Sequence, residues 1–231
     1  MSSYFQHARE PMNSFTHFIG IICSIAETAC LVLLTCFSGN FTWKAFISVV
    51  IFGLSMVALY SASSVYHYVN ASTQVLERLR KLDHAMIYVL IAGSYTPVCL
   101  KFMPGAQGVL FSSVLWAIAL GGSIVKVCWM GAPRWLSTCV YIVMGWSILF
   151  APQVLAALPV GAIALLLAGG ISYTIGAVVY IFKKPNLSPA FGFHELFHVF
   201  MVHFSIFFVF YDTLSINPQK TNPSPLPSIV L

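Results

Sequence analysis

The chain has 231 residues, of which 59% are hydrophobic and only 7% are charged, and its mean hydropathy is +0.88. Soluble domains carry about 25% charged residues, so this composition excludes a soluble globule, and equally a disordered chain, a coiled coil and a disulfide scaffold. The net charge of +5 is small and scattered, and gives no argument for binding nucleic acid. The apolar surplus predicts a protein of the lipid bilayer.

Seven apolar segments are long enough to cross a bilayer, which takes about 20 residues as a helix. They are residues 14–37, 43–68, 84–103, 107–128, 136–157, 160–182 and 194–215. The polar stretch from Asn70 to Asp83 is expected to separate the second segment from the third. The first segment is too long for the apolar core of a signal peptide, about 7–15 residues. We therefore expect an all-α, seven-helix transmembrane bundle as one domain over residues 1–216, followed by a Pro-rich mobile tail over 217–231.

The distribution of basic residues indicates the orientation, because short cytoplasmic loops are enriched in Lys and Arg. Eight basic residues fall on the side of the N-terminus: Arg9, Arg78, Arg80, Lys81, Lys126, Arg134, Lys183 and Lys184. Three fall on the other side: Lys44, Lys101 and Lys220. This asymmetry predicts a cytoplasmic N-terminus, and seven helices then put the C-terminus outside.

Prolines, glycines and cysteines within the segments predict packing rather than chemistry. Pro97 and Pro152 are expected to kink the third and fifth helices. Gly121-Gly122 and Gly169-Gly170 are expected to allow close approach between helices. The six cysteines form no CxxC pair, and we expect them to be small buried hydrophobic residues without a disulfide or a thiolate metal site.

Polar and ionisable residues gather at one level of the predicted bundle, near the cytoplasmic ends of four helices. Such groups are costly at membrane depth and by default mark functional sites. The residues at this level are Glu10, Asn13, His17, Ser63, His67, Asp83, His84, His194, Glu195 and His198. Their convergence follows from the assignment of the spans alone.

Three histidines at this level predict a metal site. His194 and His198 are four residues apart and share one face of a helix, so two imidazoles can bind one ion. His67 supplies a third imidazole, and three histidines with an open fourth position are typical of catalytic zinc. Asp83 is expected to hold and deprotonate a water, and Ser63, one turn before His67, to bond a ligand or that water.

Two further histidines have other interpretations. His17 is either a competing third ligand or a polar partner of Glu10 or Asn13 in the first helix. His84 follows Asp83 but points about 100° away from it on a helix, so we expect an interfacial side chain.

Three ionisable residues lie deeper in the predicted bundle. Glu27, near the middle of the bilayer, marks either a substrate or proton path or a structural contact. His203 is expected to be buried and hydrogen-bonded, and Asp212 to be solvated near the outer end of the last helix.

Four motifs, in this order, resemble the haemolysin III family, the bacterial branch of the progestin and adipoQ receptor family. They are Glu10-Pro11-Met12-Asn13-Ser14-Phe15-Thr16-His17, Ser63-Ser64-Val65-Tyr66-His67, Leu82-Asp83-His84 followed by Gly93 to Pro97, and His194-Glu195-Leu196-Phe197-His198. Each motif alone is short, but the ordered set covers the chain from about Glu10 to Asp212.

The resemblance implies a multi-pass protein of a bacterial inner membrane with zinc on His67, His194 and His198. It implies Asp83 beside the metal-bound water, and alkaline ceramidases are distant relatives with a similar residue set. We therefore expect a zinc-dependent hydrolase of a lipid amide that takes a membrane lipid as substrate and serves membrane homeostasis. A receptor or sensor with structural zinc, and a haemolysin-type cytolysin, stay open, as does the oligomeric state.

The last motif also matches HExxH, in which the Glu of a zinc protease activates water. Such proteases take their third ligand from downstream, where this chain offers only His203 and Asp212. We therefore expect Asp83 to be the base, and Glu195 to complement the dipole at the start of its helix.

Overall fold

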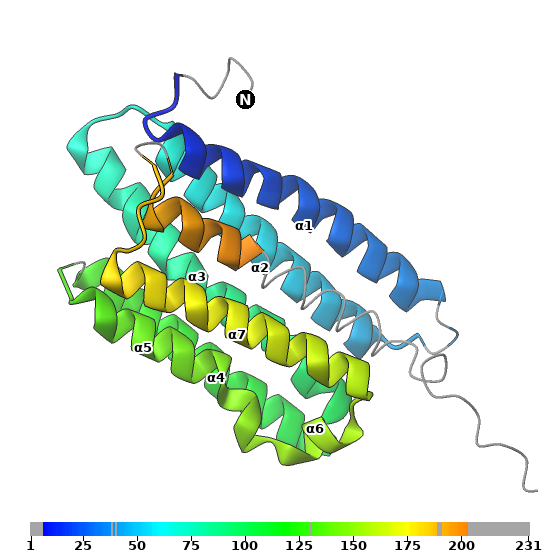
Figure 1. Cartoon of the computed structure of the whole chain (residues 1–231). Coiled ribbons are helices and arrows are strands. Elements are labelled where there is room, and N and C mark those ends of the chain that lie inside the picture. Colours follow the sequence, from blue (N-terminus) through cyan, green and yellow to red (C-terminus); the bar gives the residue numbers. More distant parts are fainter. Residues whose placement is uncertain (1–6, 38, 40, 130, 189–190, 203–231) are drawn as a thin grey trace, which may run out of the picture.

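The apolar segments form helices, in which every backbone N–H and C=O within a segment finds its partner without water. The computed structural model in Figure 1 describes residues 7–37, 39, 41–129, 131–188 and 191–202. Its elements are α1 (Pro11–Phe37), α2 (Trp43–Tyr68), α3 (Thr73–Phe102), α4 (Gly105–Cys128), α5 (Arg134–Gly145), η2 (Ser147–Phe150), α6 (Pro152–Ala157), α7 (Val160–Phe182) and a helix over Phe193–Val202. Over these described ranges there is no strand, only an isolated bridge between Ser188 and Phe191. The expectation of an all-α protein is confirmed.

Five of the helices are long and apolar enough to span a membrane: α1, α2, α3, α4 and α7. Four of them agree closely with the predicted segments. The third starts earlier than expected, because α3 begins at Thr73 and the stretch Asn70–Asp83 is therefore mostly helical. Only its first residues, 70–72, separate α2 from α3, so the predicted separation is too long, and Asp83 lies inside α3 rather than at its start.

The predicted fifth helix, 136–157, is divided in the structure. α5 ends at Gly145, the 3₁₀ turn η2 follows, and Pro152 is the first residue of α6. Pro152 thus begins a new helix instead of kinking one, as suits a residue without a backbone N–H. Pro97, in contrast, lies inside α3, which continues to Phe102.

The predicted seventh helix is described only in its first part, Phe193–Val202. His203, Asp212 and the tail over 217–231 lie outside the described residues. The count of seven spans and the orientation of the chain stay predictions.

α3 is the central helix, and it buries nearly every residue from Ile87 to Cys99. α2 packs on α3 and α1 on α2, while α4, α5 and α6 also contact α3. The short helix Phe193–Val202 (orange in Figure 1) lies against α2 and α7. Large apolar side chains such as Ile22, Leu54 and Leu110 are exposed on the outer faces, where a bilayer would cover them.

The predictions for small residues are only partly right. Of the six cysteines only Cys99 is fully buried, while Cys30, Cys36, Cys128 and Cys139 are exposed on apolar helix surfaces that lipid suits as well as protein does. A Cβ at Gly122 would lie 2.5 Å from the ring of Tyr88, so this glycine does permit a close approach between α4 and α3. Gly121 faces open space.

Candidate metal centre

The segment before α1 is bound to the end of α2 by backbone hydrogen bonds. Arg9 N–H donates to Tyr68 C=O at 3.2 Å, and Glu10 N–H to His67 C=O at 3.0 Å. One turn further along, Ser14 and Ser64 each donate a hydroxyl hydrogen bond of 3.0 Å to the other's backbone carbonyl. These bonds fix Glu10 beside His67.

Three histidines from two helices meet at this end of the bundle. His67 on α2 and His194 and His198 on the helix Phe193–Val202 offer ring nitrogens that all lie within 4.8 Å of one another. His67 Nε2 and His194 Nε2 are 3.4 Å apart. Two nitrogens that bind one tetrahedral zinc at about 2.0–2.1 Å are separated by about 3.3–3.4 Å. The spacing of this pair therefore fits zinc.

Two of the rings are oriented through their other nitrogen. His67 Nδ1 lies 2.6 Å from Glu10 Oε2, and His198 Nδ1 lies 3.4 Å from Thr16 Oγ1. Contacts of this kind hold a metal-binding histidine in place and leave Nε2 for the ion. The hydrogen bond with His67 lowers the pKa of Glu10 to about 2, so Glu10 is a carboxylate at neutral pH.

His17 lies next to the group without belonging to it. Its ring stacks on that of His198, with 3.6 Å between the ring centroids, and its two nitrogens are buried with no hydrogen-bond partner in the part of the chain that the structure describes. The predicted partners of His17 bond elsewhere, since Asn13 Nδ2 donates to Glu10 Oε2 at 3.2 Å. The expected contact of His17 with Glu10 or Asn13 is therefore wrong.

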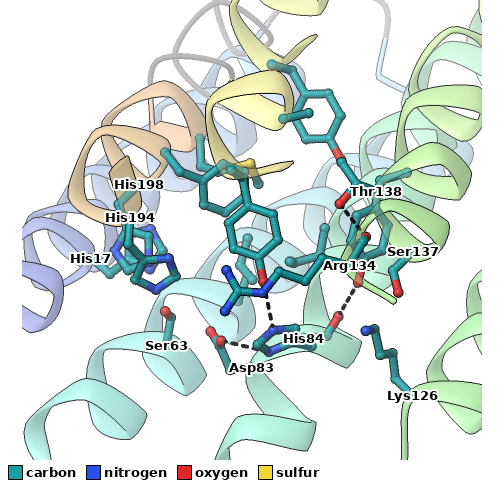
Figure 2. Close-up of a pocket in the computed structure, with 18 residues that line it drawn as sticks. His17, Ser63, Asp83, His84, Lys126, Arg134, Ser137, Thr138, His194 and His198 are labelled. Carbon is teal, nitrogen blue, oxygen red and sulfur yellow. Dashed lines mark hydrogen bonds and ion pairs between the residues drawn. The ribbon is translucent and has the colours of Figure 1, made fainter. Parts of the chain in front are cut away.

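Asp83 and Ser63 face the histidines from α3 and α2. Asp83 is only 7% exposed, and the buried hydroxyl of Ser63 lies close enough to its carboxylate to donate a hydrogen bond. Figure 2 shows both side chains beside His17, His194 and His198, at the edge of one cavity that they all line. A buried hydroxyl next to a carboxylate is suited to bind a polar group that enters this cavity.

The helical geometry predicts that His84 points away from Asp83, but in the structure the two side chains are in contact. Its Nδ1 lies 2.9 Å from the carbonyl oxygen of Arg80 and 3.3 Å from Asp83 Oδ2, so an N–H there faces both acceptors. Tyr180 Oη approaches the other ring nitrogen at 3.5 Å. His84 thus links Asp83 to α7, and the prediction of a merely interfacial residue is wrong.

Glu195 is turned back toward its own helix terminus. Its Oε2 accepts a hydrogen bond of 2.8 Å from the N–H of Gly192, which is half of a capping box. Glu195 does not line the cavity that Asp83 lines.

Residues that the sequence interpretation used only to orient the chain also belong to this region. Lys126 and Arg134 line both the cavity beside Asp83 and a second opening beside His67, with a volume of about 350 Å³. Tyr180 and His194 line both as well, so the two spaces are adjacent. The only hint in the sequence was the position of Lys126, still inside an apolar segment.

Comparison with known proteins gives consistent matches over nearly the whole chain. Residues 5–209 match the family model described as "Haemolysin-III related". The chain is 38% identical over 196 residues to the "Hemolysin-3 homolog" of Bacillus subtilis, covering 84% of this chain and 87% of that protein. It is 35% identical over 194 residues to "Hemolysin-3" of Bacillus cereus, covering 84% of this chain and 85% of that protein. The human "Monocyte to macrophage differentiation factor" is 27% identical over 203 residues, covering 85% of this chain and 79% of that protein.

Proposed function

The chain belongs to the haemolysin-III-related family, and we propose that it is a zinc-dependent hydrolase that cleaves an amide bond in a membrane lipid. It is a multi-pass membrane protein, so contact with lipid is expected along its length. We propose the bacterial inner membrane as its location and membrane homeostasis as its role.

The observation that carries this proposal is the combination of three converging histidines with an acid and a buried hydroxyl. A structural zinc site closes its fourth position with a protein ligand. Among the described residues, the group that meets within 4.8 Å has three members, His67, His194 and His198. Asp83 and Ser63 lie on the side of this group that faces the cavity. A structural zinc ion requires neither an acid nor a hydroxyl group there.

Zinc is the ion that this donor set favours, because neutral imidazoles and an open position match its catalytic sites. When bound, zinc supplies Lewis acidity, which polarises a carbonyl group and makes water more acidic. We propose His67, His194 and His198 as its ligands, with Glu10 and Thr16 orienting two of the rings.

Asp83 is the proposed base. Its carboxylate accepts a proton from the attacking water and returns it to the amide nitrogen as the acyl C–N bond breaks, so that a fatty acid and an amine leave. His84 and Tyr180 hold this carboxylate in position, and Ser63 donates a hydrogen bond to the water or the substrate oxygen. Glu10, Asn13 and His17 surround the ligands without reacting.

Two other functions make different predictions. A receptor or sensor with structural zinc would leave the lipids of its membrane unchanged. The names of the Bacillus relatives suggest a cytolysin. Such a protein would make liposomes leak equally well as the wild type and as His198→Ala, since pore formation does not need the metal.

The decisive experiment in cells compares the lipids of membranes that contain the wild-type protein with those that contain His67→Ala. We expect one class of amide-linked lipid to be depleted and its fatty acid released by the wild type only. His7→Ala, a histidine change on the exposed segment before Glu10, serves as the control and should behave like the wild type. Identical lipid profiles for all three proteins would contradict the proposal.

A further inference from the structure

Three cationic side chains from three helices surround the opening beside the histidine group. Arg80 on α3, Lys126 on α4 and Arg134 on α5 line the opening of about 350 Å³, which His67 and His194 also line. These cations are far apart in the sequence, so only the packing of α3, α4 and α5 brings them to one place.

Lys126 is the member of this set that an ordinary basic surface does not explain. It is 5% exposed, yet among the described residues no carboxylate or hydrogen-bond acceptor pairs with its amine. Figure 2 shows its amine directed toward the cavity that Arg134 and His84 line. Most of this side chain is buried while the amine itself reaches the open space, where it can bind an anion that enters from outside.

The other two cations are also free of acidic partners within the described part of the chain. The guanidinium of Arg134 lies over the ring of Tyr180, 5.2 Å from its centroid, which holds it at the opening. The two carboxylates nearby are already engaged: Glu10 with Arg9 and His67, and Asp83 with His84. The opening therefore carries an excess of positive charge.

We propose that Arg80, Lys126 and Arg134 bind the phosphate group of a lipid headgroup. Guanidinium and ammonium donors form strong charge-assisted hydrogen bonds to phosphate oxygens. A lipid is favoured over a free ion because the adjoining cavity, about 30 Å³ in this structure, is lined by apolar side chains, among them Leu59, Ile87 and Phe197.

This proposal deepens the proposed function, since it makes the substrate a phosphate-bearing amide lipid. The position of the amide beside the histidines rests on the proposed function. The phosphate site itself rests on the three cations. His194 lines both spaces, so a headgroup held at the cations lies next to the proposed metal centre.

Binding is tested without catalysis by native mass spectrometry of the full-length protein in detergent. The probes are a phosphatidylglycerol and a diacylglycerol with the same acyl chains, neither of which has an amide. We expect the wild type to retain the phosphatidylglycerol far better, and Lys126→Met to lose about tenfold in its affinity, as for one charge-assisted bond. Arg80→Gln and Arg134→Gln should weaken binding similarly. Because both side chains are exposed, these variants provide the same test if Lys126→Met fails to fold.

Arg78→Gln is the matched control, because Arg78 lies on the same helix as Arg80 and outside both cavities. Equal loss in Arg78→Gln and Arg80→Gln would reduce the effect to general surface charge and overturn the site. Full displacement of the phospholipid by millimolar inorganic phosphate would overturn the assignment to a lipid. Hydrolysis of uncharged lipid amides without any preference for phosphate would overturn the headgroup site and leave the hydrolase standing. Selective phospholipid binding without hydrolysis of any lipid amide would overturn the hydrolase and leave the headgroup site standing.

Discussion

At the scale of single residues, the site depends on side chains that hold other side chains. Glu10 Oε2, 2.6 Å from His67 Nδ1, sets which nitrogen of that ring faces the group. The stacking of His17 on His198 limits the rotation of a second ring. These neighbours decide whether three histidines are ready for an ion or must be ordered when it binds.

The first prediction concerns Glu10. Glu10→Gln keeps the size of the side chain and removes its charge, so zinc affinity should fall about 10- to 100-fold, as is usual for an orienting partner. Zinc affinity of the purified protein is measured by competition with a chelator, with His194→Ala as the reference for a lost ligand.

Glu77→Gln is the control for Glu10→Gln, because Glu77 pairs with Lys81 on the exposed face of α3. Its zinc affinity should match that of the wild type. Equal affinities for Glu10→Gln and Glu77→Gln would show that Glu10 does not support a metal site.

At the scale of helices, close packing around α3 positions Asp83 and Ser63 against each other. The part of the site that the sequence could predict lies on single helices: the four-residue spacing of His194 and His198 puts them on one face. The contact of His84 with Asp83 and Tyr180 depends on side-chain rotamers and on α7, which no pattern within α3 encodes.

The second prediction uses the neighbouring glycines of α4. Gly122→Ala brings a methyl group against the ring of Tyr88, which is buried and packed on Tyr141. Overpacking of this kind costs about 1–3 kcal/mol, so the detergent-solubilised protein should unfold at a lower temperature. Gly121→Ala meets nothing within 4 Å and should unfold like the wild type. The same unfolding temperature in both variants would contradict the described packing of α3 on α4.

At the scale of the whole molecule, composition and the lengths of the apolar segments predicted the all-helical fold, and the ordered motifs predicted the family. The sequence predicted a kink at Pro152 but not the break that starts at Gly145, because the segment 136–157 is mostly apolar. Tertiary contacts satisfy its irregular backbone. Ile148 N–H, for example, donates to the hydroxyl of Tyr95 at 3.0 Å. Lys126, which the sequence interpretation counted with the loop cations, is buried in α4 and lines the same opening as Arg80 and Arg134 from other helices.

The third prediction concerns topology. α5 and α6 together run alongside the long helices from one end of the bundle to the other (Figure 1), so this broken segment should still cross the membrane. With an inside N-terminus and seven crossings, a reporter fused after Leu231 should be active only outside the cytoplasm. Cytoplasmic activity of that reporter would contradict either the count or the orientation.

The central claim is zinc-dependent hydrolysis of a lipid amide with Asp83 as the base. Its most direct test measures the fatty acid that the purified protein releases from vesicles containing amide-linked lipids, with zinc and after its removal by a chelator. The wild type should release fatty acid only with zinc, Glu195→Gln should stay close to it, and Asp83→Asn should lose at least about 100-fold in rate while it keeps its zinc. No release by the zinc-loaded wild type, or an active Asp83→Asn beside an inactive Glu195→Gln, would contradict the account.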